Sequence, residues 1–98
     1  MLVPFYLPID THHSDPKYLG GNAGQKLFDL PEDVHREIHK LIDEVFPRTA
    51  PKGIYAMLFQ NPEFKEYVKE TLVGIYSQYE GQYPGLLASF FKAFNQRP

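Results

Sequence analysis

The sequence predicts an α+β fold, in which a short β-hairpin and a helix precede a helical extension. Residues 1–30 are rich in proline and glycine and poor in helix formers, which favours extended segments joined by turns. From residue 31 onward, apolar residues recur at helical spacing between proline- or glycine-containing breaks. These two patterns place the hairpin first and the helices after it.

The N-terminal part is expected to be extended. The prolines in Leu2–Ile9 exclude this segment from the centre of a sheet. Beyond it, Ile9–His13 and Lys26–Asp29 are predicted to pair as a hairpin across a long, glycine-rich loop.

The first helix is expected to run to about Phe46, because Pro47 cannot continue it. Asp29 is the predicted N-cap, with Pro31 in the first turn and Glu32 at the capping-box position. Apolar side chains at helical spacing predict one buried face, formed by Val34, Ile38, Leu41, Ile42 and Val45.

Residues 47–98 are expected to form three further helices. The breaks place a short helix at about 49–59, a longer one from Asn61 to Gly81, and a last one that starts at Pro84. A chain of 98 residues suits one domain, so residues 1–98 are expected to share one modest core.

Composition restricts the possible functions. The chain has no cysteine, so disulfides and thiolate metal sites are impossible, and a metal site must use His, Asp, Glu, carbonyl groups or water. No apolar run is long enough for a membrane segment. The net charge of -2 lacks the basic surplus that is typical of nucleic-acid binders. Phosphate contacts would therefore need a local cluster of cations, or the partner is not nucleic acid.

All four histidines fall in two tight pairs. His35 and His39 lie four residues apart in the predicted helix, so both rings can share one metal ion. His12 and His13 are adjacent in an extended segment, where neighbours point to opposite sides. One of this second pair can join the metal while the other faces away. Three imidazole ligands and one free imidazole are suited to metal-assisted hydrolysis with a histidine general base.

The segments around these histidines also carry a family resemblance. From His12 the chain has the sequence H-H-S-D-P-K-Y-L-G-G, and after a gap it has L-P-E-D-V-H-R-E-I-H. This combination resembles the HNH, or His-Me finger, nucleases, and above all the colicin-type DNases and the related toxin domains of bacterial polymorphic toxins. The resemblance covers Ile9 to Phe46 and implies a ββα-metal core at about 9–46, followed by a helical extension at about 47–98. Residues 47–98 carry no such likeness.

The resemblance implies a role for each histidine. His12, His35 and His39 correspond to the family's metal ligands, and His13 corresponds to the general base that takes a proton from the attacking water. By ligand type, three imidazoles favour zinc or nickel, while magnesium or manganese can occupy such a site during turnover. Pro16 and the Gly20-Gly21 pair would shape the loop, because only glycine takes a positive φ there at little cost.

The substrate implied by the resemblance is a phosphodiester of nucleic acid, with DNA favoured over RNA. Lys17, Lys26 and Arg36 are the predicted phosphate contacts. Lys26 stands where the family usually carries an asparagine that braces the loop, so another residue must meet that role or it is absent. Asp15 is expected either to orient an imidazole or to fix the turn before the proline.

The implied biological setting is a larger secreted toxin, delivered into a target cell to act in its cytoplasm, with a cognate immunity protein as partner. Two alternatives stay open. In the first, the chain is a non-enzymatic helical protein-interaction domain with incidental histidines. In the second, the histidines hold a structural zinc ion in a binding domain that cleaves nothing.

Overall fold

The computed structural model describes residues 9–51 and 53–97, and it has the predicted α+β composition. The first half contains β1 (Ile9–His12), a short 3₁₀ turn η1 (Lys17–Leu19), β2 (Phe28–Pro31) and α1 (Glu32–Val45). The second half contains the helices α2 (Ile54–Leu58), α3 (Pro62–Ser77) and α4 (Leu86–Asn95). The helical extension expected after residue 47 is thus confirmed for the residues described.

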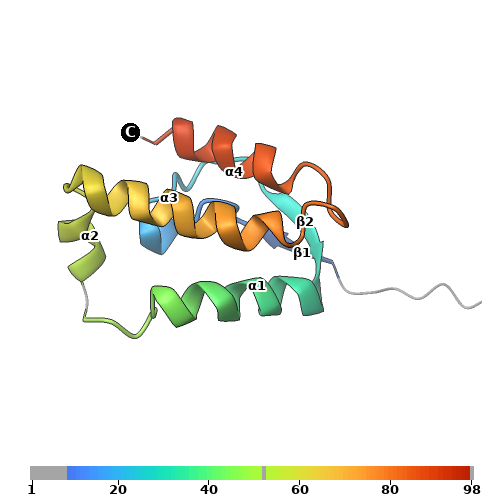
Figure 1. The fold of residues 1–98 in the computed structure, drawn as a ribbon, viewed down its shortest axis with the longest axis horizontal. Coiled ribbons are helices and arrows are strands. Elements are labelled where there is room, and N and C mark those ends of the chain that lie inside the picture. Colours follow the sequence, from blue (N-terminus) through green and yellow to red (C-terminus); the bar gives the residue numbers. More distant parts are fainter. Residues whose placement is uncertain (1–8, 52, 98) are drawn as a thin grey trace, which may run out of the picture.

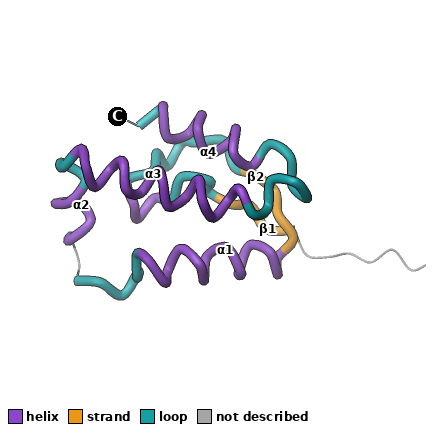
Figure 2. The backbone as a smooth tube through the Cα atoms, viewed as in Figure 1, coloured by secondary structure: helices purple, strands orange, loops and turns teal. Residues whose placement is uncertain are grey.

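The long helices form a layer of roughly parallel rods. In Figures 1 and 2, α3 lies between α1 and α4, and it packs against both. The hairpin lies behind these helices, and both of its strands contact α1. The short helix α2 packs beside η1 at one end of the molecule. Within the described ranges, no helix has the length and apolar character that crossing a membrane requires.

The two strands pair antiparallel, as the sequence predicts, but the second strand starts later than expected. His12 pairs with Phe28, and Ile9 pairs with Pro31. Asp29 therefore lies inside β2 opposite Thr11, and its prediction as a helix N-cap is wrong. Pro31 explains the difference: its φ of -55° and ψ of 143° keep it extended, so the helix begins only at Glu32.

Helix α1 begins without a side-chain cap and instead carries acidic residues in its first turn. Glu32 and Asp33 lie there, where the partial positive charge of the helix N-terminus stabilises carboxylates. The predicted apolar face is centred on Ile38 and Ile42, which are fully buried. Val45 was expected on the same face but is 39% exposed, because it lies in the last turn beyond the edge of the core.

The later helices begin and end close to the predicted positions. The Asn61 side chain accepts a hydrogen bond of 2.8 Å from the Glu63 backbone amide, as expected for an N-cap. Helix α3 ends at Ser77 rather than at Gly81. Gly85 precedes α4 with a φ of 100°, a backbone conformation that residues other than glycine rarely adopt.

One buried cluster joins the hairpin to the helices. Its members come from η1, β2, α1, α3 and α4, and the largest fully buried apolar side chains are Tyr76, Phe90, Leu19, Leu30, Ile38, Ile42, Leu72 and Leu86. The predicted extended segment Leu2–Ile9 lies outside the described residues, apart from Ile9 in β1.

Candidate metal centre

Three of the four histidines converge on one point. His12 ends β1, while His35 and His39 lie one turn apart on α1, which packs against that strand. One ring nitrogen from each of the three lies within 4.8 Å of the other two, a spacing that can hold a metal ion. The ring centroids of His35 and His39 are each 5.2 Å from that of His12. The structure thus brings together the three residues predicted as ligands.

Hydrogen bonds around His12 determine which of its nitrogens is free. The Tyr76 hydroxyl donates to the Ser14 carbonyl oxygen at 2.6 Å, so it must accept from His12 Nε2 at 2.9 Å. With its proton on Nε2, His12 keeps the lone pair on Nδ1. This buried Nδ1 has no hydrogen-bond partner among the described residues. A buried acceptor without a partner lowers the free energy of unfolding, and a cation shared with the two neighbouring rings would give this Nδ1 a partner.

A hydrogen bond also fixes the tautomer of His35, with the proton on the other ring nitrogen. Its Nδ1 lies 3.1 Å from Asp10 Oδ2 and donates to that carboxylate, which leaves the lone pair on Nε2. This Nε2 lies 2.8 Å from Nε2 of His39. Because the Arg48 guanidinium can only donate to His39 Nδ1, the His39 proton lies on Nε2 and is donated to His35 Nε2 in this structure. A cation held by both Nε2 atoms would require that proton to move to His39 Nδ1 and the contact with Arg48 to open. With that rearrangement, the residues present fit a metal with imidazole ligands.

The electrostatic surroundings keep two of the candidate ligands neutral. Burial lowers the pKa of His12 to about 3, with further lowering from His39 and His35. Burial also lowers the pKa of His39 to about 4, with a second contribution from the Arg48 guanidinium. Neutral imidazole is the form that binds metal, so both rings are ready as ligands near pH 7.

His13 stands apart from this cluster. It follows the end of β1, is half-buried, and lines a cavity of about 360 Å³ together with His35 and His39. The cavity, which we call the base-side pocket, is completed by Thr11, Pro16, Lys17, Tyr18 and Arg48. Burial, followed by the nearby Lys17 charge, lowers the pKa of His13. An uncoordinated, neutral imidazole thus opens onto the same space as two of the candidate ligands.

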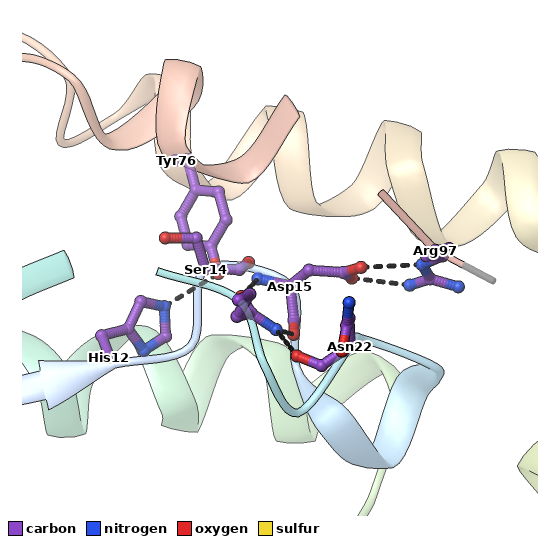
Figure 3. A network of polar contacts seen from close by, with 7 residues as sticks. His12, Ser14, Asp15, Asn22, Tyr76 and Arg97 are labelled. Atoms are coloured by element: carbon purple, nitrogen blue, oxygen red, sulfur yellow. Dashed lines mark hydrogen bonds and ion pairs between the residues drawn. The ribbon is translucent and has the colours of Figure 1, made fainter. Parts of the chain in front are cut away.

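The loop after His13 is fastened by the C-terminal half of the chain (Figure 3). Asp15 is fully buried and forms two hydrogen bonds with Arg97, at 2.6 and 2.7 Å. Ser14 contacts Ser89 through their hydroxyls at 2.7 Å and accepts the bond from Tyr76 described above. The possibility that Asp15 orients an imidazole is therefore wrong, because its carboxylate is used to bind Arg97.

The same loop is braced from the other side by Gln25. Its amide donates to the Asp15 carbonyl at 2.7 Å and accepts from the Asp15 backbone amide at 3.1 Å. It also donates to the Asn22 carbonyl at 2.7 Å. Gln25, next to Lys26, thus supplies a buried side-chain amide that holds the loop.

Steric constraints explain why glycine occupies both positions 20 and 21 of the loop. Gly20 has a φ of 97°, in the left-handed region. A Cβ at Gly21 would collide with the Asp15 backbone carbonyl. The glycine pair therefore lets the chain turn tightly behind the segment that carries His13.

The predicted phosphate contacts have different outcomes. Lys17 lines the base-side pocket. Arg36 lines a neighbouring hollow of about 580 Å³, which we call the helix-side pocket, but it also pairs with Glu32 one turn earlier on α1. Lys26 is exposed and lines neither pocket, so the structure does not bring it to the site.

Sequence reasoning missed several residues that support the site. Asp10 had a local signal, because it lies two residues before His12 and so on the same side of β1. Tyr76 had none, since 64 residues separate it from His12. Arg48 follows the predicted first helix, and nothing in the sequence distinguishes it from the other basic residues of the chain.

Comparisons with known proteins assign neither a family nor a function to this chain. No family model matches the chain, and neither a curated protein nor a solved structure matches it.

Proposed function

We propose that the chain is a metal-dependent endonuclease that hydrolyses phosphodiester bonds of nucleic acid, with a ββα-metal core over about residues 9–46. The observation that carries the proposal is the arrangement of the histidines. Three imidazoles converge within 4.8 Å, and the fourth lines a pocket that two of them share. This combination suits hydrolysis better than a structural zinc site, because a purely structural site needs no free imidazole beside it.

In this proposal His12, His35 and His39 hold a divalent ion, and His13 is the general base. A bound divalent ion supplies positive charge that stabilises the phosphate oxygens as negative charge develops. His13 accepts the proton of the water that attacks phosphorus, and its lowered pKa leaves it unprotonated near pH 7. The Asp10 carboxylate and the Tyr76 hydroxyl keep two ligand rings in the required tautomer and orientation.

The ligand set favours zinc or nickel, and magnesium or manganese are the alternatives for turnover. Despite the net charge of -2, the two pockets carry a local excess of cations. They are lined by Lys17, Arg36, Lys40 and Arg48 against Asp43 and Glu44. The preference for DNA over RNA, delivery as part of a secreted toxin and the cognate immunity protein come from the resemblance alone and stay predictions.

The direct test is cleavage of plasmid DNA and of RNA with Zn²⁺, Ni²⁺, Mg²⁺ or Mn²⁺, each with and without EDTA. We expect cleavage that EDTA abolishes. We expect His13→Ala to lower the rate about 100-fold or more, the usual scale for loss of a general base. Calorimetry should show that this variant still binds Zn²⁺. Lys92→Ala, which changes an exposed residue on α4, is the control and should cleave like the wild type.

Two results would remove the proposal. One is intact nucleic acid with every ion, and the other is a His13→Ala variant that cleaves at the wild-type rate. Tight Zn²⁺ binding without any cleavage would favour the structural zinc site. An absence of metal binding would favour the non-enzymatic interaction domain.

A further inference from the structure

Arg48 occupies an unusual place relative to the histidines. It lies just after α1, in the part of the chain that carries no family resemblance. The base-side pocket and the helix-side pocket have three lining residues in common, and these are His35, His39 and Arg48. Lys17 lines only the first pocket and Arg36 only the second. Arg48 is therefore the cation that both hollows share beside the candidate metal centre.

The Arg48 side chain is held in place from one side. Its Nε lies 3.2 Å from Asp43 Oδ1, and its guanidinium carbon lies 5.2 Å from the centre of the Tyr18 ring. Tyr18 is itself fixed, because its hydroxyl donates to the Phe46 carbonyl at 2.8 Å. Arg48 Nη2 also donates to His39 Nδ1, a contact that would open if His39 bound a metal ion through Nε2. These contacts direct the guanidinium toward the imidazoles.

The remaining surface of this guanidinium is open. The Arg48 side chain is 48% exposed, and its carboxylate partner Asp43 is half-exposed as well, so the ion pair is weak and screened. A guanidinium has five N–H donors arranged as a planar fork that matches the oxygens of a phosphate. Arg36 has the same chemistry, but it pairs with Glu32 and is absent from the pocket that His13 lines.

We propose that Arg48 binds the phosphate of a substrate phosphodiester, with its guanidinium donating to non-bridging oxygens in the pocket that His13 also lines. The inference rests on the proposed function and extends it, because it gives residues beyond the predicted core a role in substrate binding. It also explains how a chain with a net charge of -2 can hold a polyanion: an exposed cation lines the pocket that His13 lines, beside the candidate metal centre.

The test measures binding separately from cleavage. In the His13→Ala background with Zn²⁺ bound, we would measure the affinity for a fluorescein-labelled oligonucleotide by anisotropy over a series of salt concentrations. We expect Arg48→Ala to weaken binding at least about tenfold and to reduce the salt slope by about one. Arg48→Lys, which keeps the charge without the fork, should fall between the two. Lys92→Ala removes one charge on α4 and should leave the affinity unchanged within about twofold.

Controls separate this role from a structural one. Arg48→Ala should change Zn²⁺ affinity much less than oligonucleotide affinity, although Arg48 contacts His39. Thermal unfolding should match that of the parent, and in the otherwise native chain KM should rise more than kcat falls. Unchanged oligonucleotide affinity would overturn the proposal. So would a loss of Zn²⁺ affinity equal to the loss of oligonucleotide affinity, because Arg48 would then act through the ligands.

The outcome for Arg48 is distinguishable from that of the nuclease proposal. If the parent binds the oligonucleotide but the native chain never cleaves, the nuclease is excluded while the effect of Arg48 on binding still decides its role. If the parent binds neither the oligonucleotide nor inorganic phosphate, the Arg48 proposal fails, and the cleavage assay decides the nuclease proposal separately.

Discussion

The two halves of the chain contribute to the site in different ways. Residues 9–46 carry all four imidazoles, whereas residues 47–97 carry groups that hold or surround them. Pairs between the halves include His12 with Tyr76, Ser14 with Ser89, Asp15 with Arg97 and His39 with Arg48. The candidate ligands are thus a local feature of the sequence, and their support is a product of the tertiary fold.

The division is not complete. His35 takes its partner, Asp10, from the first half, and Gln25 braces Asp15 from within the same half. The first half alone can therefore orient one candidate ligand and part of the loop, but it leaves His12 Nε2 and the Asp15 carboxylate without partners. If the comparison is correct, disturbing the second half should damage a site whose histidines are all intact.

The largest effect is expected from the ion pair between Asp15 and Arg97, whose side chains are 0% and 6% exposed. Arg97→Met keeps an apolar stem beside the Phe94 and Phe59 rings but leaves the Asp15 carboxylate buried and unpaired. Breaking one partner of such a pair costs about 3–5 kcal/mol. Urea denaturation of the purified variant measures this loss in the free energy of unfolding.

The matched control is Arg36→Met, which breaks the pair with Glu32 on α1. There the arginine side chain is 73% exposed, so the expected loss is below about 1 kcal/mol. Equal losses for the two variants would contradict the view that the C-terminal arginine anchors the loop. Burial raises the pKa of Asp15, and Arg97 opposes this shift. Removal of Arg97 should therefore raise that pKa further, and Asp15 would take up a proton at less acidic pH.

A smaller effect is expected from the hydroxyl of Tyr76. Tyr76→Phe removes the acceptor of His12 Nε2 and the donor to the Ser14 carbonyl, at a cost of about 1–3 kcal/mol for groups left unpaired in the core. Without the hydroxyl, His12 is free to change its tautomer, and Zn²⁺ affinity should fall about 10–100-fold. Competition with a chromophoric chelator measures that affinity.

Tyr67→Phe provides the comparison for this variant, because Tyr67 is on the same helix and is half-exposed. It should bind Zn²⁺ like the wild type. If Tyr76→Phe also bound Zn²⁺ with unchanged affinity, the second half would stabilise the fold without positioning the ligand.

The sequence separation of the contacting residues explains how much of the fold and of the candidate site could be predicted from the sequence. Local patterns were sufficient for the hairpin, for the long helices and for the N-cap at Asn61, because each depends on residues a few positions apart. The histidine cluster was predictable for the same reason, given one pair on a helix and one at a strand end.

The failures have equally physical causes. Asp29 carried a cap signal, but strand pairing with Thr11 outweighed it. Tyr76 and Arg97 lie 64 and 82 residues from their partners, and no periodicity connects such positions. Lys26 was predicted as a phosphate contact but lines neither pocket, and a charged side chain has the same sequence signature at a phosphate site as on a solvated surface.

The smallest effect is expected from Gln25. Its substitution tests the hydrogen bonds that the first half itself makes to the loop after His13, in comparison with those made by the second half. Gln25→Ala leaves the Asp15 backbone amide and carbonyl without their side-chain partner, at a cost of about 1–2 kcal/mol. Because the loop carrying His13 loosens while the three ligands keep their partners, cleavage should fall and Zn²⁺ affinity should not. Lys26→Ala, one residue away and exposed, should change neither quantity. A larger cleavage defect in Lys26→Ala than in Gln25→Ala would contradict this view. It would indicate that Lys26 contacts the phosphate and that Gln25 does not position the loop for cleavage.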